Sequence, residues 1–268
     1  MKPNSRLGQH FLTDRNILGR IVDALDPAPG EVVLEIGPGK GSLTEVLLAR
    51  GLTVIAVEKD RRLAEQLRDR VSGARCQVVP GDALRLDWHA LSAGHLTPDT
   101  RHRLKIVGNI PYNITSPLLD KALTPPLPAC IVFLLQREVA DRLSAPPGSK
   151  TYGALSVGVQ AQCRVERLFA VPAGAFAPRP KVTSALVRLT PLADPVVEPG
   201  EVPAFRAFVT ACFARRRKQL RNVLMAATGR SAAVVSAALH ELSLDPTARP
   251  ETLGPPAFAR LLRWSARL

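Results

Sequence analysis

Short apolar runs that alternate with helical patterns are the feature of this chain that most limits its possible folds. Five of these runs cover residues 32–36, 54–57, 77–79, 104–107 and 131–135. The segments between them have the spacing of amphipathic helices, and before the first run one helix face would contain Ile17, Leu18, Ile21, Val22 and Leu25. Because strands and helices alternate along the chain, the sequence predicts an α/β fold with a parallel sheet.

Two further apolar runs, at residues 164–169 and 184–189, lie later in the chain. The proline-rich loop between them is too short to hold the crossover helix that a parallel pair would need. We therefore expect these two runs to pair antiparallel, and we expect the whole sheet to be mixed, with about seven strands.

A proline-rich stretch at residues 191–203 has no periodic apolar pattern and is typical of a linker. It separates a sheet-containing domain, residues 1–190, from residues 204–268. The latter have helical spacings and contain no strand candidate. We expect them to form a small all-helical C-terminal domain.

The chain is strongly basic, with 36 Lys and Arg, 23 Asp and Glu, and a formal net charge of +13. This charge favours a polyanionic partner, either nucleic acid or an anionic membrane. The N-terminus lacks the apolar core of a signal peptide and no segment resembles a membrane span, so we expect a cytoplasmic protein that binds nucleic acid and no membrane. The 4 Cys form no C-x-x-C pair and the 5 His have no metal-ligand spacing, so we expect no metal.

A glycine-rich segment follows the first apolar run and places Gly37, Gly39 and Gly41 before an expected helix. The G-x-G-x-G spacing departs from the G-x-G-x-x-G pattern that binds the pyrophosphate of NAD or FAD. Glu35, just before the glycines, would be unfavourable beside a pyrophosphate but favourable near an amino or sulfonium cation. The segment therefore favours S-adenosylmethionine as the cofactor.

Acidic residues follow the next two strands at the same edge of the expected sheet. Glu58 ends the second strand, where a carboxylate can accept hydrogen bonds from both hydroxyls of a ribose. Asp82 follows the third strand, where its carboxylate could accept a hydrogen bond from the adenine amine of the cofactor. Each acid alone could be a solvated strand end, but together with the glycines they indicate a nucleoside-binding site.

The tetrapeptide Asn109-Ile110-Pro111-Tyr112 directly follows the fourth apolar run, where open α/β sheets bind ligands. The Asn109 side-chain oxygen and the Ile110 carbonyl could accept the two N–H groups of an exocyclic adenine amine. Pro111, with its restricted φ, would hold that carbonyl in place, and the Tyr112 ring could stack on the base. The same residue types also suit an ordinary strand-to-turn junction.

Five cations within seven residues stand in the C-terminal part of the chain with no acid among them, namely Arg215, Arg216, Arg217, Lys218 and Arg221. We expect them at the start of a helix. A run of this kind can be a solvated helix face. It can also contact the phosphates of a nucleic acid, and binding should then weaken steeply as the salt concentration rises.

Four segments, EIGPGKGSLT, AVEKD, GDAL and NIPYNITSPLL, resemble the motifs of the ribosomal RNA adenine dimethyltransferase family. The similarity covers nearly the whole chain, including GQHFL, FAPRPKVTSAL and ARRRKQLRN, and it is greatest to the bacterial members that act on the small subunit. The resemblance implies a Rossmann-like class I methyltransferase sheet with S-adenosylmethionine as cofactor. It also implies that the substrate is the 16S rRNA of the small (30S) ribosomal subunit or its precursor, in which two adjacent adenines of the 3′-terminal hairpin each receive two N6-methyl groups.

By the same resemblance, residues 1–28 form a segment and a helix that close over the cofactor. The implied cofactor-binding residues are His10, Leu12, Gly37, Gly39, Glu58, Asp82 and Asn109. In this set, Gly37 borders the methionine part of the cofactor and Asn109 lies between the two substrates. Many relatives have Asn where this chain has His10, so a backbone contact of His10 is expected more than a side-chain contact.

Phe176 matches a family loop whose aromatic ring faces the target base opposite Tyr112, which implies an aromatic sandwich around that base. From its position alone, Phe176 could equally be a core residue at a proline-rich turn. Arg179 and Lys181 flank it and could contact phosphates. The resemblance also favours a phosphate-binding role for the cations at 215–221, and it makes residues 204–268 an RNA-binding domain.

Other functions are compatible with parts of the sequence. The chemistry of residues 109–112 is the same for any adenine amine, so an N6-methyltransferase of 23S rRNA or DNA would have the same motifs. A protein that chiefly binds RNA as a ribosome assembly factor would also be basic. An NAD-dependent oxidoreductase fits the glycine spacing poorly. We expect a monomer.

Overall fold

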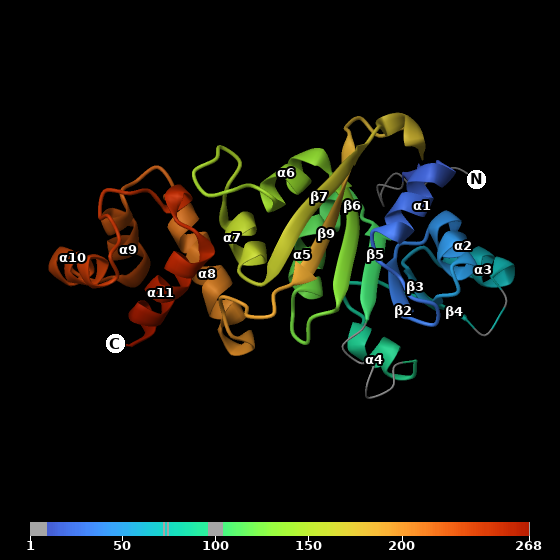
Figure 1. The fold of residues 1–268 in the computed structure, drawn as a ribbon, viewed down its shortest axis with the longest axis horizontal. Coiled ribbons are helices and arrows are strands. Elements are labelled where there is room, and N and C mark those ends of the chain that lie inside the picture. The colour runs from blue at the N-terminus through green and yellow to red at the C-terminus, as the bar shows by residue number, and fades with distance from the viewer. Residues whose placement is uncertain (1–9, 72, 74, 96–103, 268) are drawn as a thin grey trace. The chain divides into compact units, whose positions relative to one another are not determined.

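The computed structural model of the protein describes residues 10–71, 73, 75–95 and 104–267, which form two compact units (Figure 1). The first unit contains the residues up to Ala140 together with Glu166–Pro191. The second unit contains Asp141–Val165 together with the chain from Leu192 onward.

The chain passes from the first unit to the second at Pro191–Leu192, where the linker was expected to begin, but one earlier segment departs from the expected division. Residues 141–165 come before that boundary in the sequence, yet they pack with the C-terminal helices, because Tyr152 lies in the same apolar cluster as Phe205. Part of the expected linker is also helical, since a helix begins at Val202. Proline content marks an irregular segment, but it carries no information about which residues a neighbouring helix packs against.

A seven-stranded sheet organises the first unit. In spatial order its strands are β4 (Cys76–Pro80), β3 (Thr53–Glu58), β2 (Val32–Ile36), β5 (Lys105–Asn109), β6 (Cys130–Gln136), β9 (Ser184–Pro191) and β7 (Cys163–Val171). The strands from β4 to β6 are parallel, and β9 pairs antiparallel with β6. The mixed sheet of seven strands confirms the sequence prediction, and so does the position of β7 beside β9.

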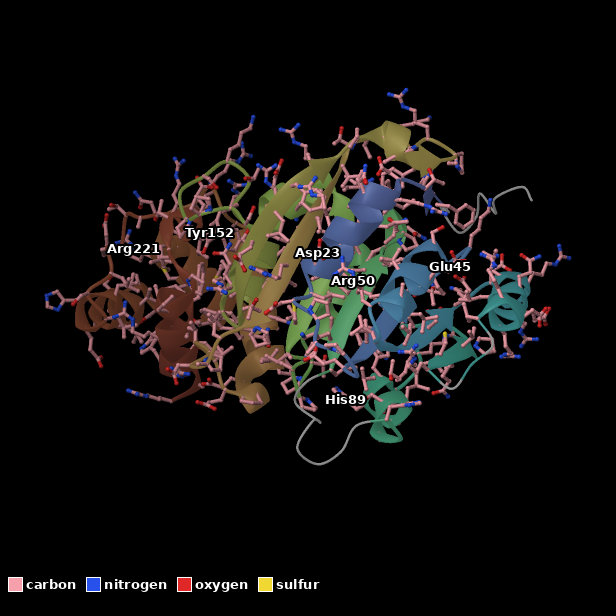
Figure 2. The ribbon with its side chains drawn as sticks, turned by 45° about the vertical axis from the view of Figure 1, so that its right-hand side comes forward. Asp23, Glu45, Arg50, His89, Tyr152 and Arg221 are labelled. Atoms are coloured by element: carbon pink, nitrogen blue, oxygen red, sulfur yellow. The ribbon has the colours of Figure 1, made fainter. Side chains whose placement is uncertain are left out.

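Helices alternate with the parallel strands along the chain (Figure 1). They are α1 (Arg15–Asp23), α2 (Ser42–Ala49), α3 (Arg61–Arg70), α4 (Trp88–Ala93), α5 (Thr115–Ala122) and α6 (Arg137–Leu143), with the 3-10 turns η3 (Tyr112–Ile114) and η4 (Ala173–Ala175). The carboxylates of Asp14, Asp60 and Asp87 accept backbone N–H groups in the first turns of α1, α3 and α4, which stabilises these helix starts. At the end of α1, Asp23 forms an ion pair of 2.8 Å with Arg50, the residue after α2 (Figure 2).

The core of this unit lies where α1, α2 and α3 pack on the sheet. All residues of β2 are buried. The three helices contribute Ile21, Leu47 and Leu67, whose side chains are almost fully buried. Burying one apolar side chain of this size stabilises a fold by about 1.5–3 kcal/mol. The packed sheet gives the carboxyl ends of its strands fixed positions.

A two-stranded sheet, for which the sequence gives no signal, connects distant parts of the first unit. β1 (Phe11–Leu12) pairs antiparallel with β8 (Phe176–Ala177), and Leu12 lies opposite Phe176. The backbone before α1 is therefore held beside the loop that connects β7 with β9.

Helices make up most of the second unit, as the sequence predicts. They are α7 (Ala154–Gln160), α8 (Val202–Phe213), α9 (Leu220–Thr228), α10 (Ala232–Glu241) and α11 (Pro255–Ala266), with the 3-10 turns η5 (Pro199–Glu201) and η6 (Pro250–Thr252). The buried rings of Tyr152, Phe205 and Phe258 belong to their common core. The Tyr152 hydroxyl donates to the Leu253 carbonyl at 2.9 Å, so this buried polar group has a partner (Figure 2 labels Tyr152).

The basic run lies mainly in a turn and not at the start of a helix, which corrects the expectation. Residues 215–218 connect α8 with α9, whereas Arg221 lies in the first turn of α9 (Figure 2). The physical reason is that α9 is defined by its buried positions Leu220, Val223 and Leu224, and four consecutive cations offer no apolar position to bury.

Among the described residues, no single helix combines the length and apolar character needed to cross a membrane; α9 and α10 do so only as a pair that is bent by 119°. All four cysteines are free thiols. Within the part of the chain that the structure describes, no three metal-ligating side chains are grouped as a candidate metal site.

Candidate active site

A pocket opens at the carboxyl ends of the parallel strands in the first unit. The chain order reverses at β2, because β3 and β4 lie on one side of it and β5 and β6 on the other. This is the topological switch point at which open α/β sheets bind ligands. The predicted site residues that line the pocket are His10, Gly37, Gly39, Glu58, Asp82, Asn109, Ile110, Pro111 and Tyr112.

The glycines after β2 let the backbone turn tightly beside the pocket. Gly37 and Gly39 have φ values of +69° and +58°, which L side chains rarely adopt. A Cβ on Gly39 would lie 2.9 Å from ring carbons of Phe11, closer than real Cβ contacts. The Gly37 N–H donates to the Val57 carbonyl at 2.9 Å, which ties the loop to the end of β3. Conformation therefore favours glycine at both positions, and the close approach of Phe11 favours it further at Gly39.

Glu58 ends β3 and is only 5% exposed. Its two carboxylate oxygens accept the N–H groups of Gly39 at 2.9 Å and Asp60 at 2.8 Å. Burial raises the pKa of the carboxyl, and these backbone donors act against the rise. A carboxylate has about four lone-pair sites, so Glu58 can still accept hydrogen bonds from hydroxyl groups of a ligand in the pocket.

Asp82 follows β4 and forms an ion pair of 2.8 Å with Lys59. The hydrogen bond from Lys59 lowers the pKa of Asp82, with the Leu84 N–H also contributing, so the carboxyl is ionised at neutral pH. Lys59 itself lines the pocket, which sequence reasoning missed. The only sequence signal was its position after Glu58 at a strand end, where a lysine is usually solvated.

Asn109 is the last residue of β5, and the backbone of His10 orients its side chain. The Asn109 Nδ2 donates to the His10 carbonyl at 2.7 Å. Because a carbonyl oxygen can only accept, the amide nitrogen must face His10 and the amide Oδ1 points away from it. Oδ1 is thus oriented to accept a hydrogen bond from a ligand. The following residue, Ile110, donates its N–H to the Leu134 carbonyl at 3.1 Å, which holds the backbone after β5.

The Tyr112 ring lines the pocket at the start of η3. Its hydroxyl is 3.0 Å from the Ser184 Oγ, at hydrogen-bond distance. The His10 imidazole lies 6.1 Å from the Tyr112 ring between centroids, with the two planes tilted by 30°. The His10 Nδ1 donates to the Pro178 carbonyl at 2.9 Å, so this imidazole is itself held in place.

Phe176 is not brought opposite Tyr112 in this structure. It is 5% exposed and belongs to the apolar core, and it is absent from the described residues that line the pocket. In an antiparallel pair, residues directly opposite each other point to the same face, so Phe176 shares the core side with Leu12. A sandwich around a base would therefore require this ring to leave the core.

Leu12 is buried in that core, and its neighbour Phe11 lines the pocket in its place. Successive residues of a strand point to opposite faces, which separates the two side chains. Phe11 covers Gly39, and the Lys40 Nζ lies 5.0 Å from its ring centroid. A strand of two residues is too short to reveal this alternation in the sequence, and Phe11 was missed for that reason.

Glu35 lies within β2 and is 1% exposed. Burial raises the pKa of its carboxyl to about 8, although the hydrogen bond from the Thr44 hydroxyl, 2.6 Å long, opposes the rise. Glu35 lines a smaller pocket that shares Phe11 and Asn109 with the larger one. The carboxyl is therefore buried and largely protonated at neutral pH, so it carries little of the negative charge that was expected to favour a sulfonium cation over a pyrophosphate.

Raising the pH should destabilise the fold through Glu35. The carboxyl binds its proton more tightly in the folded state, with a pKa of about 8, than in the unfolded state, where its pKa has the ordinary value of 4.5. Its stabilising contribution is therefore complete below the unfolded pKa and is lost as the pH rises through 8. Urea denaturation of cofactor-free protein between about pH 5 and pH 9 should show this fall.

The Glu35→Gln variant should flatten that pH dependence, because the amide does not titrate. The matched control is Glu45→Gln, which changes an exposed acid on α2 and should keep the wild-type slope. Identical slopes for wild type and Glu35→Gln would contradict the assignment.

The predicted RNA-binding cations differ in their surroundings. Most of them have exposed side chains. These are Arg179 and Lys181 in the first unit and Arg215, Arg217, Lys218 and Arg221 in the second. Arg216 is partly buried, and its guanidinium donates to the Glu251 carboxylate at 2.6 Å and to the Lys150 carbonyl at 3.2 Å. Arg216 thus connects the turn before α9 with two other segments of the second unit.

Comparison with known proteins agrees with this geometry. A family model described as ribosomal RNA adenine dimethylase matches residues 1–249. The Ribosomal RNA small subunit methyltransferase A of Hahella chejuensis is 44% identical over 258 residues, which are 96% of this chain and 90% of that protein.

Solved structures with the same fold are methyltransferases. The dimethyladenosine transferase from Plasmodium falciparum has a TM-score of 0.77 and 26% identity, covering 95% of this chain and 97% of that one. The 23S rRNA methyltransferase ErmE has a TM-score of 0.72 and 30% identity, covering 94% and 98%. The sheet order, the helical second unit and the switch-point pocket therefore define a Rossmann-like methyltransferase.

The chain belongs to the ribosomal RNA adenine dimethylase family. This membership confirms the resemblance, the fold class and S-adenosylmethionine as the cofactor that the sequence indicated. The roles of individual site residues remain predictions.

Proposed function

We propose that this protein transfers methyl groups from S-adenosylmethionine to the N6 amines of two adjacent adenines in the 3′-terminal hairpin of 16S rRNA, within the small ribosomal subunit or its precursor. The observation that carries the proposal is the Asn109 side chain, whose amide nitrogen is bound by the His10 carbonyl so that its oxygen is left for the substrate. The 44% identity to a small subunit methyltransferase supports the choice of RNA. The enzyme acts as a monomer in the cytoplasm.

The residues of the pocket fit S-adenosylmethionine. Glu58 accepts the ribose hydroxyls, Asp82 accepts the adenine amine, and the loop at Gly37 and Gly39 lets the backbone approach the ligand closely. The G-x-G-x-G spacing of this loop, in place of G-x-G-x-x-G, argues against the pyrophosphate of NAD or FAD. When bound, the cofactor supplies a methyl group that the positive charge of its sulfonium has activated.

The target adenine enters the same pocket after leaving its stack, at a cost of about a few kcal/mol. Its amine is a poor nucleophile because the nitrogen lone pair is delocalised into the ring. The Asn109 Oδ1 and the Ile110 carbonyl accept the two N–H groups and turn the lone pair out of conjugation. Stacking on Tyr112 stabilises the extruded base by about 1 to 3 kcal/mol.

No general base is required for this reaction. The bound cofactor would supply the methyl group, whose transfer to the amine would break the S–C bond and leave on the amine the positive charge that sulfur loses. The amine then loses a proton to solvent. The site therefore needs acceptors at fixed positions more than it needs a group with a tuned pKa.

The experiment that tests this function offers methyl-labelled S-adenosylmethionine with small subunits that lack the modification, naked 16S rRNA, 23S rRNA and DNA. We expect label in two adjacent adenines of the 3′-terminal hairpin of 16S rRNA. Label in 23S rRNA or DNA alone would assign the enzyme to those substrates, and the likeness to ErmE makes 23S rRNA the necessary comparison. Binding to small subunits without any label would favour a pure assembly factor.

The exposed cations of the second unit should account for part of the RNA affinity. The double variant Arg217→Gln/Lys218→Gln should bind 16S rRNA about tenfold more weakly near 0.1 M salt, and its log–log salt slope should be smaller by about 2 because two phosphate contacts are lost. Arg216→Gln should chiefly lower the melting temperature, since it removes the contact with Glu251. Filter-binding titrations at several salt concentrations measure the affinity and the salt slope, and a thermal melt measures the effect of Arg216→Gln.

The matched control for these variants is Arg260→Gln, an exposed arginine on α11. It should leave both affinity and slope unchanged. If the double variant behaved like this control, residues 217 and 218 would be a solvated surface without an RNA contact.

A further inference from the structure

A hydrogen bond connects the stacking residue Tyr112 with a strand far away in the sequence. The Tyr112 hydroxyl lies 3.0 Å from the Oγ of Ser184, and either oxygen can be the donor. Ser184 is the first residue of β9 and is 1% exposed. Its hydroxyl is therefore buried beside the pocket without lining it.

Ser184 occupies a rigid position. It lies opposite Gln136 in the antiparallel pairing of β6 and β9. The residue before it, Thr183, accepts the N–H of Arg137 at 3.0 Å. Because the backbone at Thr183 and Ser184 is paired with residues 136 and 137, the Ser184 hydroxyl has a fixed position. A buried hydroxyl that loses its partner is destabilising, so the contact with Tyr112 is favoured.

The Tyr112 ring is held at two ends as a result. Its backbone is fixed by the 3-10 turn, in which the Ile114 N–H donates to the Pro111 carbonyl at 3.1 Å. Its far end is fixed by Ser184. These two anchors fix the long axis of the ring, because rotation about χ1 would carry the hydroxyl away from Ser184, whereas rotation about χ2 turns the ring about this axis and leaves the hydroxyl in place. Stacking depends on where that axis lies, since a base in the pocket contacts the ring face only if the ring stays beside it.

We propose that Ser184 is a positioning residue for methyl transfer, whose hydroxyl holds the Tyr112 ring at the place in the pocket where it stacks on the target adenine. The proposal rests on the stacking role proposed above for Tyr112. It also gives a reason for tyrosine at this position. A phenylalanine ring would stack equally well, and the hydroxyl that distinguishes tyrosine serves as the anchor.

A double-mutant cycle tests the coupling. We expect Tyr112→Phe and Ser184→Ala each to lower kcat/KM for the ribosomal RNA about 3- to 10-fold, as the loss of one hydrogen bond predicts. The double variant should be no worse than either single variant, because all three lack the same contact. Affinity for S-adenosylmethionine, measured by calorimetry, should stay within about twofold. Effects that multiply in the double variant would overturn the proposal, as would wild-type kinetics in either single variant.

The matched control is Ser156→Ala, which removes another buried serine hydroxyl in the second unit. Any kinetic effect of Ser156→Ala should multiply with that of Tyr112→Phe. The control separates a general loss of stability from the specific coupling, because both serine variants remove a buried hydrogen bond. Tyr112→Phe provides a second test if Ser184→Ala folds poorly, since it keeps Ser184 and the ring.

A spectroscopic readout detects the bond without any substrate. The chain has 2 Tyr, so protein labelled with ¹³Cζ-tyrosine gives two signals, which Tyr112→Phe assigns. Ser184→Ala should shift the Tyr112 signal. The Tyr152 signal should not shift, because the Tyr152 hydroxyl donates to the Leu253 carbonyl and not to Ser184. An unshifted Tyr112 signal would overturn the anchor. If the wild type methylated no ribosomal adenine, the proposed function would fail independently of this result.

Discussion

Replacing Asn109 with Ala should lower methyl transfer to ribosomal RNA about 100- to 1,000-fold or more, comparable to the loss of one preorganised hydrogen-bonding group at a reacting centre. The variant loses the oxygen that accepts the adenine amine. It also loses the amide nitrogen that donates to the His10 carbonyl, so the segment before β1 is held less firmly. Binding of S-adenosylmethionine should be mostly retained, because Glu58 and Asp82 are unchanged.

Single-turnover transfer of a labelled methyl group at saturating cofactor measures the first effect, and calorimetry measures the second. Asn109→Asp should also be strongly impaired, since it places a carboxylate oxygen against the His10 carbonyl. The control is Gln77→Ala, which removes an exposed amide on β4 that is bonded to His95. Near-normal turnover in Asn109→Ala would rule out the proposed role of its side chain.

Replacing Glu58 with Ala should weaken the binding of S-adenosylmethionine about 100-fold or more, since each hydrogen bond to a charged group contributes about 1.5–3 kcal/mol. The variant loses the acceptor for the ribose hydroxyls. It also leaves the N–H groups of Gly39 and Asp60 without their acceptor, which loosens the loop that borders the cofactor. Affinity for RNA should change little, because no RNA contact is assigned to this residue.

Titration calorimetry with S-adenosylmethionine measures this loss, and a thermal melt checks that the variant is folded. Glu45→Ala is the control, since Glu45 is an exposed acid of the same unit whose partner is Arg70 (Figure 2). Unchanged cofactor affinity in Glu58→Ala would mean that the ribose is bound elsewhere.

Much of the site could be predicted from local sequence patterns. Gly37, Glu58, Asp82 and Asn109 each follow a separate strand-like run, and the structure places all of them around one pocket. The reason is geometric, because the carboxyl ends of parallel strands share one edge of a sheet. Parallel strands bring these residues to one edge of the sheet, and the strand order β4-β3-β2-β5 places them around one pocket.

Side-chain orientation was less predictable. Leu12 and Phe176 were expected at the site and lie in the core, whereas Phe11 lines the pocket. Their orientation follows from the pairing of β1 with β8, which joins segments more than 160 residues apart. No local pattern contains such a register. Ser184 was missed for the same reason, since its partner Tyr112 is distant in the sequence.

The basic run of the second unit is another case in which the sequence did not reveal the surroundings of each side chain. The sequence predicts a cluster of cations, but a local reading treats Arg216 and Arg217 as equivalent. The structure separates them, because Arg216 is bonded to Glu251 and Arg217 is exposed. Residues 141–165 were expected in the sheet domain for a related reason, since only the apolar contacts of Tyr152 with distant helices assign them to the second unit.

The amino-acid sequence by itself determined the alternating strands and helices, the glycine turn and the chemistry at each strand end, because periodicity and turn chemistry act over a few neighbouring residues. Only the tertiary structure decided that the His10 carbonyl turns the Asn109 amide, that Ser184 meets the Tyr112 hydroxyl, and that Phe176 lies in the core. These outcomes depend on long-range register and packing, which bring together residues whose separation along the chain carries no signal of their contact.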